Sequence, residues 1–504
     1  MQNFIERHAD KIKGVTSCFD RIVLTGTIPG ICHSKGMTTH LYKHGIRIFD
    51  FTQWAEPLRD LINENAKAIA ADNDIKIEFI RKKDFRKELA IQQIIAQRGD
   101  HPGLVHIFSA MEVCNSYEPW YDKKTGKTFV RGTSGKCLHY YFYFIDKTLG
   151  LCYLRVPTWA PFRLQFYFNG HNYLAAKMRD KYIKYTMHDN AFIDIDNFDK
   201  AQELSDDFIV KQLHHIIDKY AAAYCPAITE LREKFHWSIM QAEYSTDIVF
   251  KKQSDLACIY EELTRTAIHA VKADNIATFL GKKLDSRYKD EMGNDFSTRI
   301  EGTRIKHRMG PTSVKMYDKY KLILRIETTV NDVSFFKHYR EVEHRDGTKS
   351  MKQAEMRKNI YSLPTLAELL AASNRRYIEY ISAIDDPTSA HKDIDKISRP
   401  QKDNGRNYQG FNLFNDNALN LFQTILRGET NINGFTSKFI RKHLCDKSCH
   451  QISRMLKRLR VHGLIKKIGK AYKYYLTKQG RRVITAALKT REMLLIPLLR
   501  GSLI

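Results

Sequence analysis

The chain has 504 residues and a formal net charge of +25, and 43% of its residues are hydrophobic. This length allows two or three domains with cores of their own, and the composition excludes an intrinsically disordered protein. Nine cysteines without regular spacing predict reduced thiols in the cytoplasm rather than a disulfide framework. Because no apolar run approaches 18 residues and the N-terminal segment is charged, we expect a soluble protein that makes no membrane contact.

The first region, residues 1–185, mixes strand and helix patterns. Residues 21–30 alternate like a strand, and residues 54–73 have the apolar spacing of a helix. Several β-like runs follow up to residue 168, and residues 121–129 predict a hairpin turn in which Gly126 supplies the positive φ. The expected fold class is α+β, with a sheet covered by helices.

The central region, residues 186–384, contains the candidate chemistry. Residues 190–198 predict a strand, and residues 206–231 predict a helix that closes at Pro226. Two strands follow within residues 313–332, and Pro364 stands near the start of a further helix. Residues 385–410 are polar, contain Pro and Gly and lack an apolar period, so they predict a linker between domains.

The last region, residues 411–504, predicts three helices, a hairpin and a final helix. Ser448 can cap the third helix and Gly463 can end it. The region carries 19 Lys or Arg against 4 Asp or Glu, which favours a nucleic-acid partner, although a solvated basic surface would have the same composition. The order of elements resembles the winged helix–turn–helix of bacterial regulators.

That resemblance implies a duplex-DNA contact. The third helix would enter the major groove and the hairpin would follow the phosphates. The groove residues would be Gln451, Arg454, Lys457 and Arg458, and the hairpin residues Lys466, Lys467, Lys470 and Lys473. A winged helix used for protein contacts is the alternative. The run "HLCDKSCH" from His443 to His450 offers two Cys and two His, but its spacing falls inside the helical pattern, so we interpret it as structural rather than as a zinc site.

Two acids alternate along the strand "NAFIDIDNF". Asp194 and Asp196 face one side and Ile193 and Ile195 the other, which places the two carboxylates about 7 Å apart. Such a pair can bind Mg²⁺ or Mn²⁺ from one side. An exposed strand with two solvated acids would show the same pattern.

The stretch "SVKMYDKYKLILRIETTVND" places ionisable groups at the heart of two strands. Arg325 and Glu327 share a face of the second strand, and a buried glutamate needs a partner or a metal. On the first strand Lys315 and Lys319 flank Tyr317, and their charge favours the phenolate. An activated phenol beside a bound cation suits attack on a phosphodiester, which gives a 5′-phosphotyrosyl link and a free 3′-hydroxyl. Alternatively, Tyr317 is a core aromatic and the residues after it form a turn.

These strings together resemble the replication-initiator proteins of rolling-circle plasmids and filamentous phages. The similar segments are "FIDIDNF", "EGTRIKHRMGPTSVKMYDK", "LRIETT" and, upstream, "NGHNYL" from Asn169 to Leu174. The resemblance implies a β-rich core in which a tyrosine nicks one DNA strand.

The same resemblance assigns roles to residues of this chain. It implies that Asp194, Asp196 and Glu327 bind the metal and that Tyr317 is the nucleophile. Arg304 joins Lys315 and Lys319 near the phosphate. Tyr320 is the alternative nucleophile if the chain turns at Asp318.

The leading hypothesis is therefore a metal-dependent DNA nicking and joining enzyme of a mobile element, with Tyr317, Lys315, Lys319 and Arg325 in the catalytic centre. It would act on single-stranded or melted DNA while the winged helix binds duplex DNA, and a homodimer is compatible with this arrangement. The alternative is a non-enzymatic winged-helix regulator whose N-terminal part senses a ligand or partner. An RNA-processing protein is a third hypothesis, since basic charge and aromatic residues also suit RNA.

Overall fold

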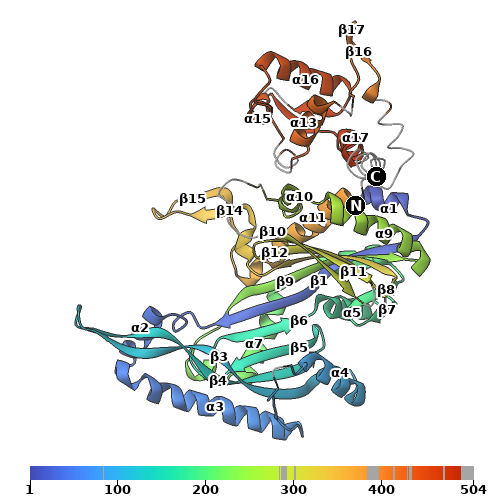
Figure 1. Cartoon of the computed structure of the whole chain (residues 1–504). Coiled ribbons are helices and arrows are strands. Elements are labelled where there is room, and N and C mark those ends of the chain that lie inside the picture. The colour runs from blue at the N-terminus through green and yellow to red at the C-terminus, as the bar shows by residue number, and fades with distance from the viewer. Residues whose placement is uncertain are drawn as a thin grey trace, which may run out of the picture. The chain divides into compact units, whose positions relative to one another are not determined.

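The structure is a computed structural model with a mixed α+β fold, as the sequence predicts (Figure 1). It describes residues 1–82, 84–282, 284, 292–299, 302–382, 395, 397–412, 415–427, 430, 434–468 and 472–489. Two compact units can be distinguished, each built from segments that are distant in the sequence. Unit 1 consists of Met1–Gly14, Asp247–Thr328 and Leu369–Ile504, and unit 2 consists of Val15–Thr246 and Thr329–Glu368.

Unit 2 takes most of its strands and helices from the first half of the chain and two strands from the second half. Its helices are α2 (Ser34–Lys43), α3 (Phe51–Asp72), α4 (Lys87–Arg98), α5 (Gly170–Asp180), α6 (Phe198–Asp206), α7 (Val210–Tyr224) and α8 (Ala227–Glu230). Its strands are β2 (Glu78–Phe79), β3 (Gly103–Asp122), β4 (Lys127–Asp146), β5 (Gly150–Pro157), β6 (Leu164–Phe168), β7 (Tyr185–His188), β8 (Ala191–Ile195), β14 (Lys337–Glu343) and β15 (Lys349–Glu355), with most of β1 (Ile12–Thr27) and β9 (His236–Phe250).

Aromatic side chains form much of the core of unit 2. Phe142 and Phe144 of β4 stack on Tyr224 and Tyr220 of α7, with ring centroids 4.4 and 4.0 Å apart. These contacts hold α7 against the sheet. The neighbouring strands follow the order β9-β1-β6-β5-β4-β3-β2.

The strands β3 and β4 form a long antiparallel hairpin that extends beyond their neighbours (Figure 1). Strand β5 pairs with β4 only from His139 onward, so the earlier part of β4 has β3 alone as a partner among the described strands. Gly126 at the tip has a φ of +66°, which confirms the predicted turn.

Unit 1 begins with a four-stranded run, β10 (Met292–Arg299), β11 (Gly302–Met309), β12 (Thr312–Lys319) and β13 (Ile323–Val330), each strand next to the one before it. Its helices in this part are α1 (Gln2–Arg7), α9 (Gln253–Ala270), α10 (Ala273–Phe279) and most of α11 (Leu363–Ile381). Every residue of β13 is buried. Three short 3₁₀ helices lie in the described part of unit 2: η1 (Ile48–Asp50), η2 (Val333–Phe335) and η3 (Ile360–Ser362).

In the described residues, the C-terminal part of unit 1 has four helices and two short hairpins, and one apolar cluster forms its core. The elements are β16 (Gln401–Asp403), β17 (Arg406–Tyr408), α13 (Asp416–Ile425), α15 (Ser437–His443), α16 (Cys449–Val461), β18 (Ile465–Ile468), β19 (Lys473–Leu476) and α17 (Lys478–Lys489). The side chain of Ser448 caps α16 and Gly463 follows it with a φ of +70°, as predicted. The predicted linker partly forms the β16–β17 hairpin, and its residues 385–394 and 396 lie outside the described residues.

The boundary between the units falls inside β1, β9 and β13, which are neighbours in the order β13-β9-β1. The predicted divisions at residues 185 and 384 do not coincide with it. No helix in the described ranges is both long enough and apolar enough to cross a membrane.

Candidate metal and tyrosine site

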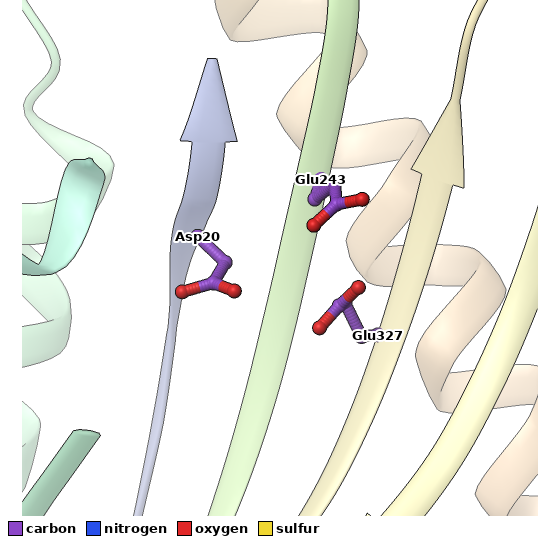
Figure 2. Close-up of side chains that lie close together, drawn as sticks. All are labelled: Asp20, Glu243 and Glu327. Carbon is purple, nitrogen blue, oxygen red and sulfur yellow. The ribbon is translucent and has the colours of Figure 1, made fainter. Parts of the chain in front are cut away.

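Three acidic side chains meet on β1, β9 and β13. One carboxylate oxygen from each of Asp20, Glu243 and Glu327 lies within 4.8 Å of the others, and the three side chains converge between the strands in Figure 2. Asp20 and Glu327 are buried and Glu243 is half-buried. Two oxygens on opposite sides of a Mg²⁺ ion are about 4.2 Å apart, so this spacing fits one hard divalent cation. Such a cation would also offset the repulsion among three close carboxylates.

The alternation of each strand explains why acids point to one place. On β9, Glu243 and Asp247 share a face, and on β13 Arg325 and Glu327 share a face. These polar positions interrupt strands that are otherwise largely buried. Each member of the group is therefore an acid, buried or half-buried, on a largely buried strand.

Glu327 accepts hydrogen bonds from two residues that the sequence analysis selected. The hydroxyl of Tyr317 donates to Oε2 at 2.8 Å, and Nζ of Lys315 lies 2.6 Å from Oε1. Tyr317 and Lys315 are half-buried, whereas the Glu327 side chain is only 3% exposed. The structure thus brings the predicted nucleophile, one predicted cation and one predicted metal ligand together.

Polar side chains of unit 2 contact the carboxylate of Asp20. Its Oδ1 lies 3.1 Å from Nδ1 of His171 and 2.5 Å from Nδ2 of Asn190, and Nδ2 of Asn169 lies 3.5 Å away. Nε2 of His171 is 3.5 Å from Oγ of Ser245. Since these contacts converge on one oxygen, they orient the carboxylate and direct Oδ2 away from them.

The "NGHNYL" segment builds this arrangement at the start of α5. Asn169 caps the helix by accepting from the backbone of His171 at 2.7 Å. A Cβ on Gly170 would lie 2.3 Å from the backbone oxygen of Phe19, so only glycine allows the helix to approach β1 this closely. Close packing of helix on strand is what places His171 beside Asp20.

Arg325 has a different environment from the one the sequence analysis expected. Its Nε and Nη2 lie 2.7 and 2.6 Å from the two oxygens of Asp247, and the guanidinium is completely buried. A fork-to-fork ion pair of this kind satisfies both charges inside the protein. The structure therefore assigns Arg325 to this pair rather than to a surface where it would meet a phosphate.

Asp194 and Asp196 do not join the carboxylate group. Strand β8 pairs only with β7 among the described strands, and Asp194 lies opposite Thr186. Asp196 follows the strand and is exposed. The group of close acidic side chains that contains Glu327 therefore does not include the two acids expected there. Asp20 and Glu243 stand next to Glu327 instead.

Sequence reasoning missed Asp20 and Glu243. Their signal was present, since "SCFDRIVL" and "QAEYSTDIVF" place acids within apolar, β-branched runs. A sequence does not show which strands are neighbours, so nothing linked these two acids to Glu327.

The turn after β12 places Tyr320 outside the strand. Tyr320 and Lys321 both have a φ of +56°, and Leu322 donates its backbone N–H to the oxygen of Lys319. The chain therefore turns after Lys319 rather than at Asp318. The ammonium of Lys319 lies 5.3 Å from the Tyr320 ring centroid.

Basic residues continue from Tyr317 across β12 and β11. Lys306 of β11 pairs with Lys315 of β12, and Arg308 pairs with Ser313, so alternate basic residues of β11 share the face of Lys315. Arg304 lies on the same face, two positions before Lys306. Like charges opposite one another are unfavourable in a sheet unless an anion is present.

The predicted DNA-contacting residues of α16 divide into two groups. Gln451 and Arg454 are exposed. Lys457 lies 2.5 Å from Oδ2 of Asp403 in β16, and Arg458 donates to the backbone oxygens of Gln409, at 2.7 Å, and of Gly410. Two of the four predicted groove residues are therefore bound by the segment that precedes this domain.

The hairpin residues are only partly described. Lys466 is exposed, Lys467 lies 3.6 Å from the ring centroid of Tyr472, and Lys473 is half-buried. Lys470 lies outside the described residues. Cys449 accepts from Arg441, and the cysteines and histidines of residues 443–450 do not form a group of three metal ligands in the described structure.

A comparison of this chain with protein-family profiles, curated proteins and solved structures found no match.

Proposed function

We propose that the protein is a metal-dependent DNA nicking and joining enzyme that acts through Tyr317. The observation that carries this proposal is the 2.8 Å hydrogen bond between the Tyr317 hydroxyl and Glu327, a member of the three-carboxylate group. This pairing supports the proposal because a nucleophile beside a bound Mg²⁺ or Mn²⁺ ion is what the reaction requires. A non-catalytic regulator has no need of this arrangement.

Two residues of the chain would prepare the attack by Tyr317. Glu327 accepts the phenolic hydrogen bond and can take the proton, while the ammonium of Lys315 stabilises the negative charge that moves from the carboxylate to the phenolate. A phenol ordinarily loses its proton near pH 10, so this assistance is needed at neutral pH. The bound cation would polarise the phosphate.

The reaction conserves the energy of the cleaved bond. The oxygen of Tyr317 forms a bond to phosphorus, the bond from phosphorus to the 3′ oxygen breaks, and the 3′ oxygen takes up a proton as it leaves. The products are a 5′-phosphotyrosyl link and a 3′-hydroxyl, which can later reverse the step and join strands. Basic residues of β11 and β12 would hold the strand by its phosphates.

The C-terminal part is proposed to hold the enzyme on duplex DNA as a winged helix. Its helices and its β18–β19 hairpin support this assignment, as does its basic composition. If it binds DNA while the Tyr317 centre proves inactive, the regulator alternative is favoured.

The proposal is tested by incubating labelled single-stranded DNA with the protein and Mn²⁺, followed by a denaturing gel. Wild type should give a protein-linked product that EDTA prevents. Tyr317→Phe should give none, and Tyr320→Phe, the matched control, should still form it. Absence of the wild-type adduct on all single-stranded substrates, or its persistence in Tyr317→Phe, contradicts the proposal.

A further inference from the structure

A cavity of about 420 Å³ lies in unit 2, away from the strands that carry the carboxylates along the sheet order. Helix α3 contributes Arg59 and Asn63, the β3–β4 hairpin contributes Cys114, Gly135 and Lys136, and Trp159 follows β5. The volume falls in the range of small-molecule sites. Neither the carboxylate group nor Tyr317 takes part in it.

The cavity lies beside the part of β4 that is not paired with β5. Strand β5 pairs with β4 from His139 onward, whereas the cavity lies beside residues 135–138 of β4. The Leu138 carbonyl accepts from the backbone N–H of Thr158 at 2.9 Å, and the residues before it form an edge of the kind that presents backbone donors and acceptors to a ligand. At Gly135 an added Cβ would meet nothing within 4 Å, so the absent side chain leaves open space at this edge.

The walls combine an aromatic ring with positive charge. Nε1 of Trp159 donates to Oγ of Ser116 at 2.8 Å, which fixes the indole plane. The guanidinium of Arg59 lies 6.0 Å from the Trp159 ring centroid. Arg59 also forms ion pairs with Asp60 and Glu56 on its own helix, which partly neutralise its charge. Lys136 adds a second, exposed cation. No acidic residue is among those that line the cavity in the described structure.

The lining also offers hydrogen-bonding groups of fixed orientation. Oδ1 of Asn63 accepts from the Tyr140 hydroxyl at 3.1 Å, which orients the amide and leaves its NH₂ group as the donor. A ligand that fits these walls has a flat ring to lie against Trp159, an anionic group for Arg59 and Lys136, and a polar edge for Asn63. A nucleotide has all three.

We propose that this cavity binds a nucleotide, with the base against Trp159 and the phosphate at Arg59 and Lys136. The ligand is a free nucleoside monophosphate or one unit of an unpaired strand, since both present the same groups. This site goes beyond the nicking centre and does not require that centre to be active.

Cys114 reports whether the cavity is filled. A hydrogen bond with Cys137 lowers the pKa of the Cys114 thiol below its ordinary value, which favours the thiolate. Iodoacetamide reacts with the thiolate. A ligand in the cavity would cover this sulfur, whereas the exposed Cys258 on α9 would stay reactive and serves as the internal control.

The first experiment measures alkylation of Cys114 in the full-length protein by peptide mass spectrometry. A nucleoside monophosphate at ten times its dissociation constant should slow the reaction about tenfold, because only the unoccupied fraction reacts. Separate arms contain an oligothymidylate, the nucleoside alone and inorganic phosphate. Protection by the oligonucleotide alone identifies a strand unit, and protection by the monophosphate identifies a free nucleotide.

The second experiment measures binding of labelled nucleotide by equilibrium dialysis. Gly135→Val should lose binding because its side chain enters the cavity, and Lys136→Gln should weaken it. Gly132→Val is the matched control, since it lies on the same strand but does not line the cavity. The proposal is overturned if no nucleotide or oligonucleotide protects Cys114, if inorganic phosphate protects equally well, or if Gly135→Val binds like wild type. Tyr317→Phe should keep this binding, which separates the result from that of the nicking assay.

Discussion

Arg325 and Glu327 lie two positions apart on one strand and yet have different surroundings. Arg325 is completely enclosed with Asp247, whereas Glu327 is bonded to the half-buried Tyr317 and Lys315. A buried ion pair that satisfies its own hydrogen bonds is a fixed part of the scaffold. A glutamate that shares a small space with a phenol, an ammonium and two further acids is suited to exchange partners when a cation or substrate arrives.

His307 provides a prediction about pH at the scale of one residue. Its Nδ1 lies 2.7 Å from Oδ1 of Asn294 and its Nε2 lies 3.2 Å from the Tyr377 hydroxyl, an arrangement that fits the neutral ring. Burial lowers the pKa of His307 to about 4, below the ordinary value of 6.5. The unfolded chain therefore takes up a proton between pH 6.5 and pH 4 that the folded chain does not, and stability falls as the pH decreases through this window.

The test compares denaturant unfolding of wild type and His307→Gln at several pH values. The wild-type free energy of unfolding should fall more steeply between pH 6.5 and 4, by up to about 1.4 kcal/mol per pH unit. Above pH 6.5 the two slopes should agree. If the free energies of unfolding of the two proteins change in parallel with pH over the whole window, His307 takes up its proton in the folded protein as readily as in the unfolded chain.

At the scale of single elements, the start of α5 fixes the Asp20 side of the site. Gly170→Ala would force the new methyl group against the Phe19 backbone, which must move because a Cβ does not fit at 2.3 Å. We expect a loss of about 1–3 kcal/mol in the free energy of unfolding. Mn²⁺ affinity should fall as well, since His171 would no longer be held beside Asp20.

Gly135→Ala is the control for this variant, because its Cβ enters open space. Denaturant midpoints and Mn²⁺ titration monitored by electron paramagnetic resonance give the two readouts. Wild-type values for Gly170→Ala in both would mean that α5 does not position the site.

Helix α16 gives a prediction that separates DNA contact from internal contact. Arg454→Ala should weaken duplex binding by about 1–3 kcal/mol if Arg454 meets a base, without changing stability. Lys457→Ala should lower the stability, since it removes the ion pair with Asp403. Binding assays at several salt concentrations and thermal unfolding separate the two effects. Equal DNA-binding losses in both variants would show that Lys457 leaves Asp403 when DNA binds.

At the scale of the whole molecule, local features could be predicted and long-range ones could not. The α+β class, the hairpin turn at Gly126 and the caps at Ser448 and Gly463 follow from residues close in sequence. The meeting of Asp20, Glu243 and Glu327 depends on neighbouring strands that come from distant parts of the chain, β1, β9 and β13. Strand alternation shows which residues share a face, but it does not identify the neighbouring strand.

The boundary between the two units could not be predicted from the sequence either. Each unit combines distant segments, so changes in composition along the chain do not mark the boundary. Strand pairing was hidden in the same way for Asp194, which has the expected alternation but lies on the β7–β8 hairpin.

The most direct test of the nicking centre is to locate the nucleotide on the protein. After reaction with single-stranded DNA and Mn²⁺, the protein is digested with nuclease and trypsin and its peptides are sequenced by mass spectrometry. The account predicts a nucleotide on Tyr317, lost in Glu243→Gln, whose side chain keeps its shape but gives up the charge that binds the cation. A nucleotide on Tyr320, a modification that persists in Glu243→Gln or forms without metal, or no modified tyrosine would contradict it.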